Sequence, residues 1–179
     1  MRALGIAQVE DDPGLQCAAD GFVFPFDAAL ATETMNQLRD AVRRIRLVHT
    51  FSKGMGLAAP QIGVPRRAAI VFPAGSDEAI TLVNPRVVDQ SATLDVPRYE
   101  GCLSFFDVRG RVRRPLALTV EHQREDGTLE RSTFGGSVGR LVAHEIDHLD
   151  GLLYSHLLEP GERLIPVADY RGTGVGWHY

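Results

Sequence analysis

Apolar residues recur at steps of three and four between residues 28 and 49, and this spacing predicts an amphipathic helix. Most of the arginines in the stretch fall on the other face, as expected for a helix with one side in solvent. Asp27 directly precedes the pattern and is placed to cap the first turn with its side chain. We therefore expect a long N-terminal helix over 28–49. Its apolar positions are Ala28, Ala31, Met35, Leu38, Val42, Ile45 and either Val48 or His49.

Strand-like runs follow this helix and are short. The last two of them flank the sequence Arg-Glu-Asp-Gly, whose Asp126-Gly127 pair favours a hairpin turn. The N-terminal 26 residues and the glycine-rich segment 53–63 are typical of loops. The predicted strands lie at residues 67–73, 79–88, 115–123 and 128–134.

A second helix is expected from Ser137 or Val138 to about Asp150, with Gly151 in the C′ position. The tail from Gly161 onward shows no helical period. Because the strands lie between two separated helices and do not alternate with helices, this order favours an α+β fold. We expect the second helix to pack centrally against small antiparallel or mixed β-sheets.

Composition limits the classes of protein to consider. The chain has 179 residues, 44% hydrophobic and 23% charged, with a net charge of −4. A chain of this length suffices for one domain over 1–179 that buries about 70% of the surface exposed in the unfolded chain. The net charge favours neither nucleic acid nor a membrane surface as a partner. No run has membrane-spanning length, no signal-peptide pattern opens the chain, and two cysteines are too few for a disulfide framework. We expect a cytoplasmic monomer.

The segment 141–151, Leu-Val-Ala-His-Glu-Ile-Asp-His-Leu-Asp-Gly, carries candidate chemistry. On a helix, His144 and His148 lie one turn apart on one face, so both rings can reach one metal ion. Glu145 lies about 100° round the helix and can act as a general base at the open coordination position. An ordinary amphipathic helix explains the segment less well, because histidines and acids interrupt an otherwise apolar pattern.

A third metal ligand must come from outside this segment. Metzincin proteases place a histidine where this chain has Tyr154, and His156 comes two residues too late. Glu159 and Glu162 follow in a segment with Pro and Gly and are weak candidates. Cys102 is stronger, because a thiolate with two imidazoles leaves a fourth position open to water. A free cysteine is also often a plain buried hydrophobe, which is how we interpret Cys17.

Three segments together resemble the signature motifs of the peptide deformylase family. They are Gly-Met-Gly-Leu-Ala-Ala-Pro-Gln at 54–61, Glu-Gly-Cys-Leu-Ser at 100–104 and His-Glu-Ile-Asp-His-Leu-Asp-Gly at 144–151. The motifs occur in the family's order, and the likeness spans most of the chain. It implies a metal-dependent hydrolase that removes the formyl group from N-formylmethionyl nascent peptides in a bacterial-type cytoplasm.

The resemblance also implies a role for individual residues. It makes Cys102, His144 and His148 the metal ligands and makes Glu145 the general acid and base that acts on a metal-activated water. The backbone N–H of Leu103 and the side-chain amide of Gln61 would stabilise the oxyanion. Residues implied in substrate binding or its support are Gly56, Met55, Leu141 and Arg109, the last paired with Glu100. Asp147 is expected to pair with a basic residue of 108–114.

For the cofactor, the resemblance implies one divalent ion per chain, Fe²⁺ in cells, with Zn²⁺, Ni²⁺ and Co²⁺ also accepted by thiolate and imidazole ligands. Some members carry a basic C-terminal helix that docks on the ribosome. The tail of this chain has few basic residues, so any ribosome association is expected to be transient and to use no such helix.

Departures from the family pattern keep other functions open. Phe105-Phe106 stands where many members have an aliphatic residue and Pro, and Ala143 stands where Gln is common. Ser137 would widen the pocket for the methionine side chain. The competing hypotheses are a specialised or catalytically silent paralogue for another formylated ligand, a zincin-like endopeptidase, and a regulatory protein with Cys102 as a redox sensor.

Overall fold

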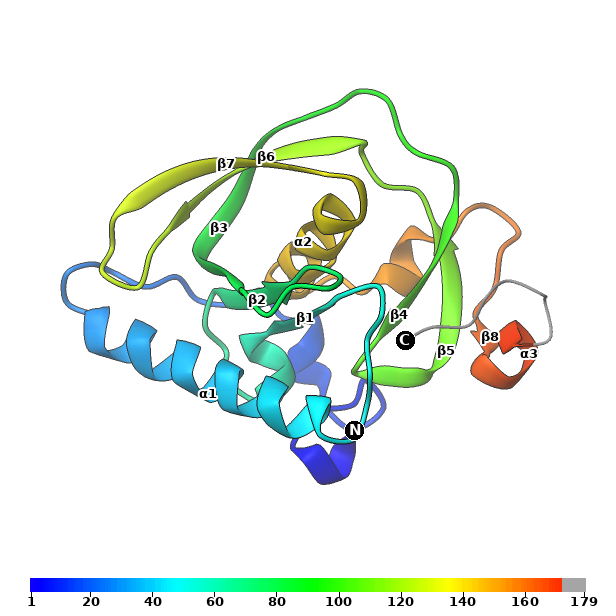
Figure 1. Ribbon diagram of the computed structural model, residues 1–179, viewed down its shortest axis with the longest axis horizontal. Coiled ribbons are helices and arrows are strands. Elements are labelled where there is room, and N and C mark those ends of the chain that lie inside the picture. Colours follow the sequence, from blue (N-terminus) through cyan, green and yellow to red (C-terminus); the bar gives the residue numbers. More distant parts are fainter. Residues whose placement is uncertain (172–179) are drawn as a thin grey trace.

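The computed structural model describes residues 1–171, and these form an α+β fold with two antiparallel sheets (Figure 1). The five-stranded sheet has the order β1-β2-β3-β6-β7 and the three-stranded sheet the order β4-β5-β8. The first sheet contains Met55–Ala58 (β1), Ala68–Phe72 (β2), Ile80–Gln90 (β3), Ala117–Gln123 (β6) and Leu129–Gly135 (β7). The second contains Arg98–Cys102 (β4), Phe105–Val112 (β5) and Ile165–Pro166 (β8).

Three α-helices and four short 3₁₀ turns complete the described chain. The helices are Ala28–Arg46 (α1), Gly136–Leu149 (α2) and Val167–Arg171 (α3), and the turns are Arg2–Leu4, Pro13–Gln16, Ala59–Ile62 and Tyr154–Leu157. No helix of residues 1–171 combines the length and the apolar character that crossing a membrane requires.

The predicted N-terminal helix is confirmed as α1, although it ends at Arg46 and not at residue 49. Its apolar positions from Ala31 to Ile45 are buried, and Met35, Leu38 and Ile45 share one core cluster, whereas Ala28 is partly buried and Val48 is exposed. Asp27 occupies the N-cap position as expected, but its side chain does not cap the helix. Its Oδ2 instead accepts hydrogen bonds from the Val23 N–H and from Arg66.

Helix α2 packs against the five-stranded sheet on the face opposite to α1. Strand β2 shows this most clearly, because Ile70 belongs to the cluster of α1 while Val71 belongs to the cluster of α2 with Val142 and Ile146. In Figure 1, α2 lies inside the arch formed by β3, β6 and β7. The predicted helix is therefore present and central.

The C-terminus of α2 forms a Schellman motif, as Gly151 predicted. Gly151 has φ of 73°, its N–H donates to the His148 carbonyl at 3.2 Å, and the Leu152 N–H donates to the Asp147 carbonyl at 2.8 Å. The motif ends α2 one residue after the His-Glu-Ile-Asp-His segment.

The four predicted strands are present as β2, β3, β6 and β7, and the Asp126-Gly127 hairpin joins the last two. Other elements were not predicted. The glycine-rich segment, expected to be a loop, contains β1, and the motif around Cys102 contains β4 and β5. The tail, expected to have no helix, contains α3, while the rest of the tail, residues 172–179, lies outside the described residues.

Candidate active site

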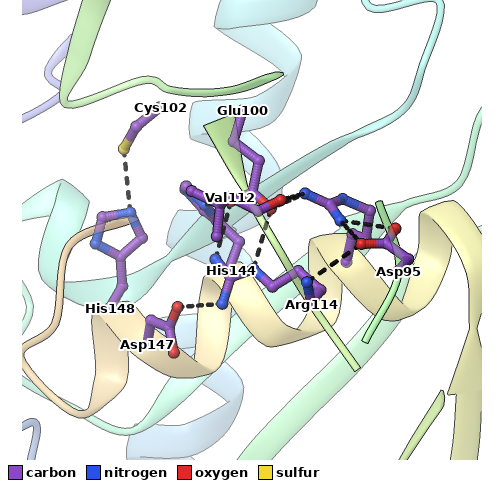
Figure 2. Close-up of polar contacts among 9 residues, drawn as sticks. Asp95, Glu100, Cys102, Val112, Arg114, His144, Asp147 and His148 are labelled. Atoms are coloured by element: carbon purple, nitrogen blue, oxygen red, sulfur yellow. Dashed lines mark hydrogen bonds and ion pairs between the residues drawn. The ribbon is translucent and has the colours of Figure 1, made fainter. Parts of the chain in front are cut away.

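Strand β4 and helix α2 bring Cys102, His144 and His148 together. One ligand atom from each of the three side chains lies within 4.8 Å of the others, and all three residues are buried. The Cys102 Sγ lies 3.1 Å from the His148 Nε2 (Figure 2). Within residues 1–171, this is the one group of three or more metal-ligating side chains that meets such a distance.

The three groups shift one another's pKa. Burial opposes the charged thiolate of Cys102, but the neighbouring imidazoles of His148 and His144 outweigh it and hold the pKa of the thiol well below its usual range. Burial likewise opposes a charged His144, yet its contacts with Cys102 and Glu100 hold its pKa well above the usual value. The pocket therefore stabilises the thiolate, the form that binds metals.

The donor set fits a divalent metal ion. The His144 Nδ1 faces Glu100 at 3.3 Å, which leaves its Nε2 to face the thiolate. The His148 Nδ1 is buried without a hydrogen-bond partner. One thiolate and two imidazoles beside an open cavity could hold a divalent metal ion with three protein ligands.

The other candidates for a third ligand lie elsewhere. The His156 Nδ1 accepts a hydrogen bond from the Leu153 N–H at 3.4 Å. Glu159 and Glu162 form ion pairs with Arg113 and Arg111. The structure therefore brings Cys102 to the histidines and leaves these residues out of the group.

We call Cys102, His144 and His148 the metal group. Glu145 lies beside it and is almost completely buried. Burial raises the pKa of its carboxyl to about 7, and its Oε2 has no hydrogen-bond partner within the protein. Gly56 of β1 lies against it, because a Cβ at this position would collide with the Glu145 carboxylate. A carboxylate with a free oxygen and a pKa near neutrality is suited to proton transfer.

Gln61 and Leu103 lie on the other side of the metal group. The Gln61 Oε1 accepts from the Ala58 N–H at 2.9 Å, and its Nε2 donates to the Ser104 Oγ at 3.1 Å and to the Cys102 Sγ at 3.5 Å. These contacts fix the amide with its N–H₂ group toward the thiolate. Leu103 follows Cys102 directly and is buried at the cavity wall.

A buried ion-pair network supports His144 from behind, as Figure 2 shows. Arg114 pairs with Glu100 at 2.9 Å and with Asp147 at 2.5 Å, and Arg140 pairs with Glu100 at 2.8 Å and with Asp95 at 2.7 Å. The network holds Glu100 as an anion, since its hydrogen bond to His144 and its pairing with Arg114 outweigh burial and lower its pKa. Carboxylates that accept a hydrogen bond from a metal-binding histidine commonly orient its ring in this way.

The network corrects one sequence expectation and confirms another. The ion-pair partners of Glu100 are Arg114 and Arg140, whereas Arg109 donates to the carbonyls of Phe106 and Val108. Asp147 does pair with a basic residue of 108–114, namely Arg114. The sequence did not lead us to predict that Arg140 pairs with Glu100. Its position four residues before His144, on the same side of α2, could have indicated it.

A cavity of about 700 Å³ opens over the metal group. Every residue that the sequence singled out for catalysis or substrate binding lines it, and so do the ligands Cys102 and His144. Ser137 and Arg140 also reach it. The lining residues named from the sequence are Met55, Gly56, Gln61, Leu103, Arg109, Leu141 and Glu145.

Taken together, the Cys-His-His group, the adjacent glutamate and the open cavity define a metallohydrolase-type site on an α+β fold. Comparisons with known proteins give the family. The sequence model of the polypeptide deformylase family matches residues 23–163, and the chain belongs to this family. Its members are metal-dependent and remove the N-formyl group from nascent peptides.

Individual relatives agree with this assignment. The peptide deformylase of Natranaerobius thermophilus is 43% identical over 106 residues, an alignment that covers 58% of this chain and 65% of the relative. A ligand-bound crystal structure of a class I type b peptide deformylase from Acinetobacter baumannii has 27% identity and a TM-score of 0.75, covering 86% of this chain and 97% of that one. Another structure of that class from the same organism, bound to Met-Ala-Ser, has 28% identity and a TM-score of 0.69, covering 86% and 96%.

Proposed function

We propose that this chain, as a single catalytic domain, hydrolyses the N-formyl group of N-formylmethionyl peptides at the site built by Cys102, His144, His148 and Glu145. Family membership supports the reaction. The observation that carries the residue assignment is that one thiolate, two imidazoles and a buried carboxyl with one unpartnered oxygen lie together beside one cavity.

The metal ion would be held by the Cys102 Sγ and the two imidazoles. When bound, it would supply Lewis acidity and lower the pKa of water at the site. Thiolate and imidazole ligands accept several divalent ions, and we propose Fe²⁺ in cells, with Zn²⁺, Ni²⁺ and Co²⁺ as alternatives. The buried Glu100 network would keep His144 in the orientation that the ion requires.

Glu145 would move the proton. It accepts a proton from the attacking water and returns it to the amine that leaves the formyl carbon, so that formate and a free N-terminus result. Its pKa of about 7, raised by burial, suits both halves of this transfer near neutral pH. Strand β1 lies against the Glu145 carboxylate, and a Cβ at position 56 would collide with it. This explains why the position is a glycine.

The oxygen of the formyl group becomes an anion during attack and needs donors. The Gln61 amide is held in place by Ala58 and Ser104, so its N–H₂ group is oriented before the reaction. The backbone N–H of Leu103 would be the second donor. Removing one such donor typically lowers the rate about 100- to 1,000-fold.

The substrate would lie extended between β1 and β4. These are the outer strands of the two sheets, and both contribute residues to the cavity. Met55 and Leu141 would contact the methionine side chain, and Arg109 would contact the peptide that follows. A relative binds Met-Ala-Ser, which is the peptide that remains when such a substrate loses its formyl group.

Nascent peptides are therefore the proposed partners, in the cytoplasm and with the protein as a monomer. Any ribosome contact would be transient. The expected absence of a basic docking helix concerns a tail whose last eight residues lie outside the described part of the chain.

The test is amine release from formyl-Met-Ala-Ser by protein loaded anaerobically with Fe²⁺ or Ni²⁺, compared with the same protein after chelation. We expect turnover with metal and a loss of turnover on chelation. Acetyl-Met-Ala-Ser and an unformylated longer peptide serve as controls. Cleavage of an internal peptide bond without deformylation would favour an endopeptidase, and one bound metal ion without turnover would favour a silent relative.

A further inference from the structure

The cavity is lined by more cations than acids. Among the described residues, the carboxylates that line it are Glu100 and Glu145, and both lie next to the metal group. Five cations line the same cavity, although the chain as a whole has a net charge of −4. They are Lys53, Arg98, Arg109, Arg111 and Arg140.

Two of these cations lie near the start of the strands that flank the cavity: Lys53 lies in a turn two residues before β1, and Arg98 is the first residue of β4. Gly56 on β1 and Cys102 on β4 mark the metal end. Lys53 comes three residues before Gly56, and Arg98 comes four residues before Cys102. At about 3.3 Å per extended residue, the chain can carry Arg98 at most roughly 13 Å from Cys102, and Lys53, which lies in a turn, less than roughly 10 Å from Gly56. The second to fourth residue of an extended peptide whose formyl group is at the metal falls within these limits.

The cations differ in whether carboxylates of the protein already pair with them. Arg140 is held by Asp95 and Glu100 inside the network, and Arg111 pairs with Glu162 at 3.1 Å. Arg98 pairs with Asp95 at 3.3 Å, but its side chain is 60% exposed, so solvent weakens this pair.

Lys53 is the available cation. It is exposed, it is the one lysine of the chain, and the ion pairs of the described residues include none for it. A lysine ammonium on a flexible stem can meet a carboxylate at several positions of a peptide.

We infer that the cavity selects formylated peptides that carry a carboxylate within the three residues after formylmethionine, with Lys53 as the specificity-determining residue and Arg98, the first residue of β4, as a second cation of the cavity wall. The inference rests on the proposed function and names the substrate class of that site. The carboxylate can be an Asp or Glu side chain or the C-terminus of a short peptide, because both present the same group to an ammonium ion.

The experiment compares kcat/KM at low ionic strength within matched pairs of peptides. Formyl-Met-Ala-Asp-amide against formyl-Met-Ala-Asn-amide tests the side chain, and formyl-Met-Ala-Ser acid against its amide tests the C-terminus. We expect a preference of about fivefold for the anion in at least one pair, falling toward one as salt is raised. Lys53→Glu should reverse the preference and Lys53→Arg should keep it.

Arg131→Glu is the matched control, since it makes the same charge change on β7, at the opposite edge of the sheet from β1. It should leave the ratio unchanged. Equal rates within both pairs, or a preference that survives Lys53→Glu, would overturn the inference while leaving deformylation intact. If no formyl peptide is turned over, the proposed function fails, and the affinities of Met-Ala-Asp-amide and Met-Ala-Asn-amide for the metal-loaded protein decide the charge selection separately.

Discussion

Helices α1 and α2 cover opposite faces of the same strand and are both amphipathic, yet they bury different chemistry. Helix α1 buries Met35, Leu38 and Ile45, and its charged residues are exposed except for the partly buried Arg39. Helix α2 buries Val142, Ile146 and Leu149 as well, but it also buries His144, Glu145 and His148. A buried polar side chain lowers stability unless it is hydrogen-bonded. We therefore expect α1 to contribute to stability alone, and α2 to carry the residues of the proposed reaction at some cost in stability.

The largest expected difference between the two helices is in kcat, and it is tested by replacing a glutamate by alanine in each of them. Glu145→Ala in α2 should lower kcat on formyl-Met-Ala-Ser by about 1,000-fold or more, because the proton acceptor is lost. Its melting temperature should stay level or rise, since a buried carboxyl with an unpartnered oxygen is removed. Glu33→Ala on the exposed face of α1 is the control and should change neither quantity. Near-normal turnover by Glu145→Ala would remove the general-base role.

The network behind α2 is expected to show the next largest effect. Arg114→Met leaves Glu100 and Asp147 without a shared cation, and breaking a buried pair in this way typically costs about 3–5 kcal/mol. Arg43→Met removes a largely exposed partner of Asp40 on α1 and should change stability by less than about 0.5 kcal/mol. Urea denaturation measures both. Equal effects at the two sites would mean that the buried network adds little to the folded state.

The core of α1 should respond in stability alone. Leu38→Ala removes a fully buried side chain and should destabilise the protein by about 2–5 kcal/mol. The kcat of the folded fraction should remain unchanged, because Leu38 does not line the cavity. A loss of kcat at a temperature where the variant is fully folded would show that α1 contributes to the site.

The same contrast explains how much of the molecule could be predicted from sequence. Helix α1 and the β6–β7 hairpin follow simple apolar periods and a turn signal, and both were predicted with small errors at their ends. Strands β4 and β5 were missed because the side chain of Glu100 is largely covered and Arg109 is buried, at positions where a pattern of hydrophobic residues expects apolar ones. Strand β1 was hidden because Gly54 precedes it and Gly56 lies within it, and Gly56 makes room for Glu145.

The residues of the site could be predicted from the sequence more fully than strands β1, β4 and β5, which position several of them. Spacing on one helix brought His144 and His148 together, and the motif around Cys102 supplied the third member of the group. Distant pairing was less accessible. Arg140 and Asp95 lie 45 residues apart and meet only once α2 packs beside the segment before β4, so no local pattern could place the second arginine on Glu100.

The most direct test of the account is the metal content of the two single-cysteine substitutions. After loading with Co²⁺, the wild-type protein and Cys17→Ser should each retain one ion per chain and show thiolate-to-cobalt charge-transfer absorption, because the exposed Cys17 lies outside the metal group. Cys102→Ser should lose that absorption and most of the ion. Full retention of the ion with an unchanged spectrum in Cys102→Ser would contradict the ligand set, and with it the assignment of the reaction to this site.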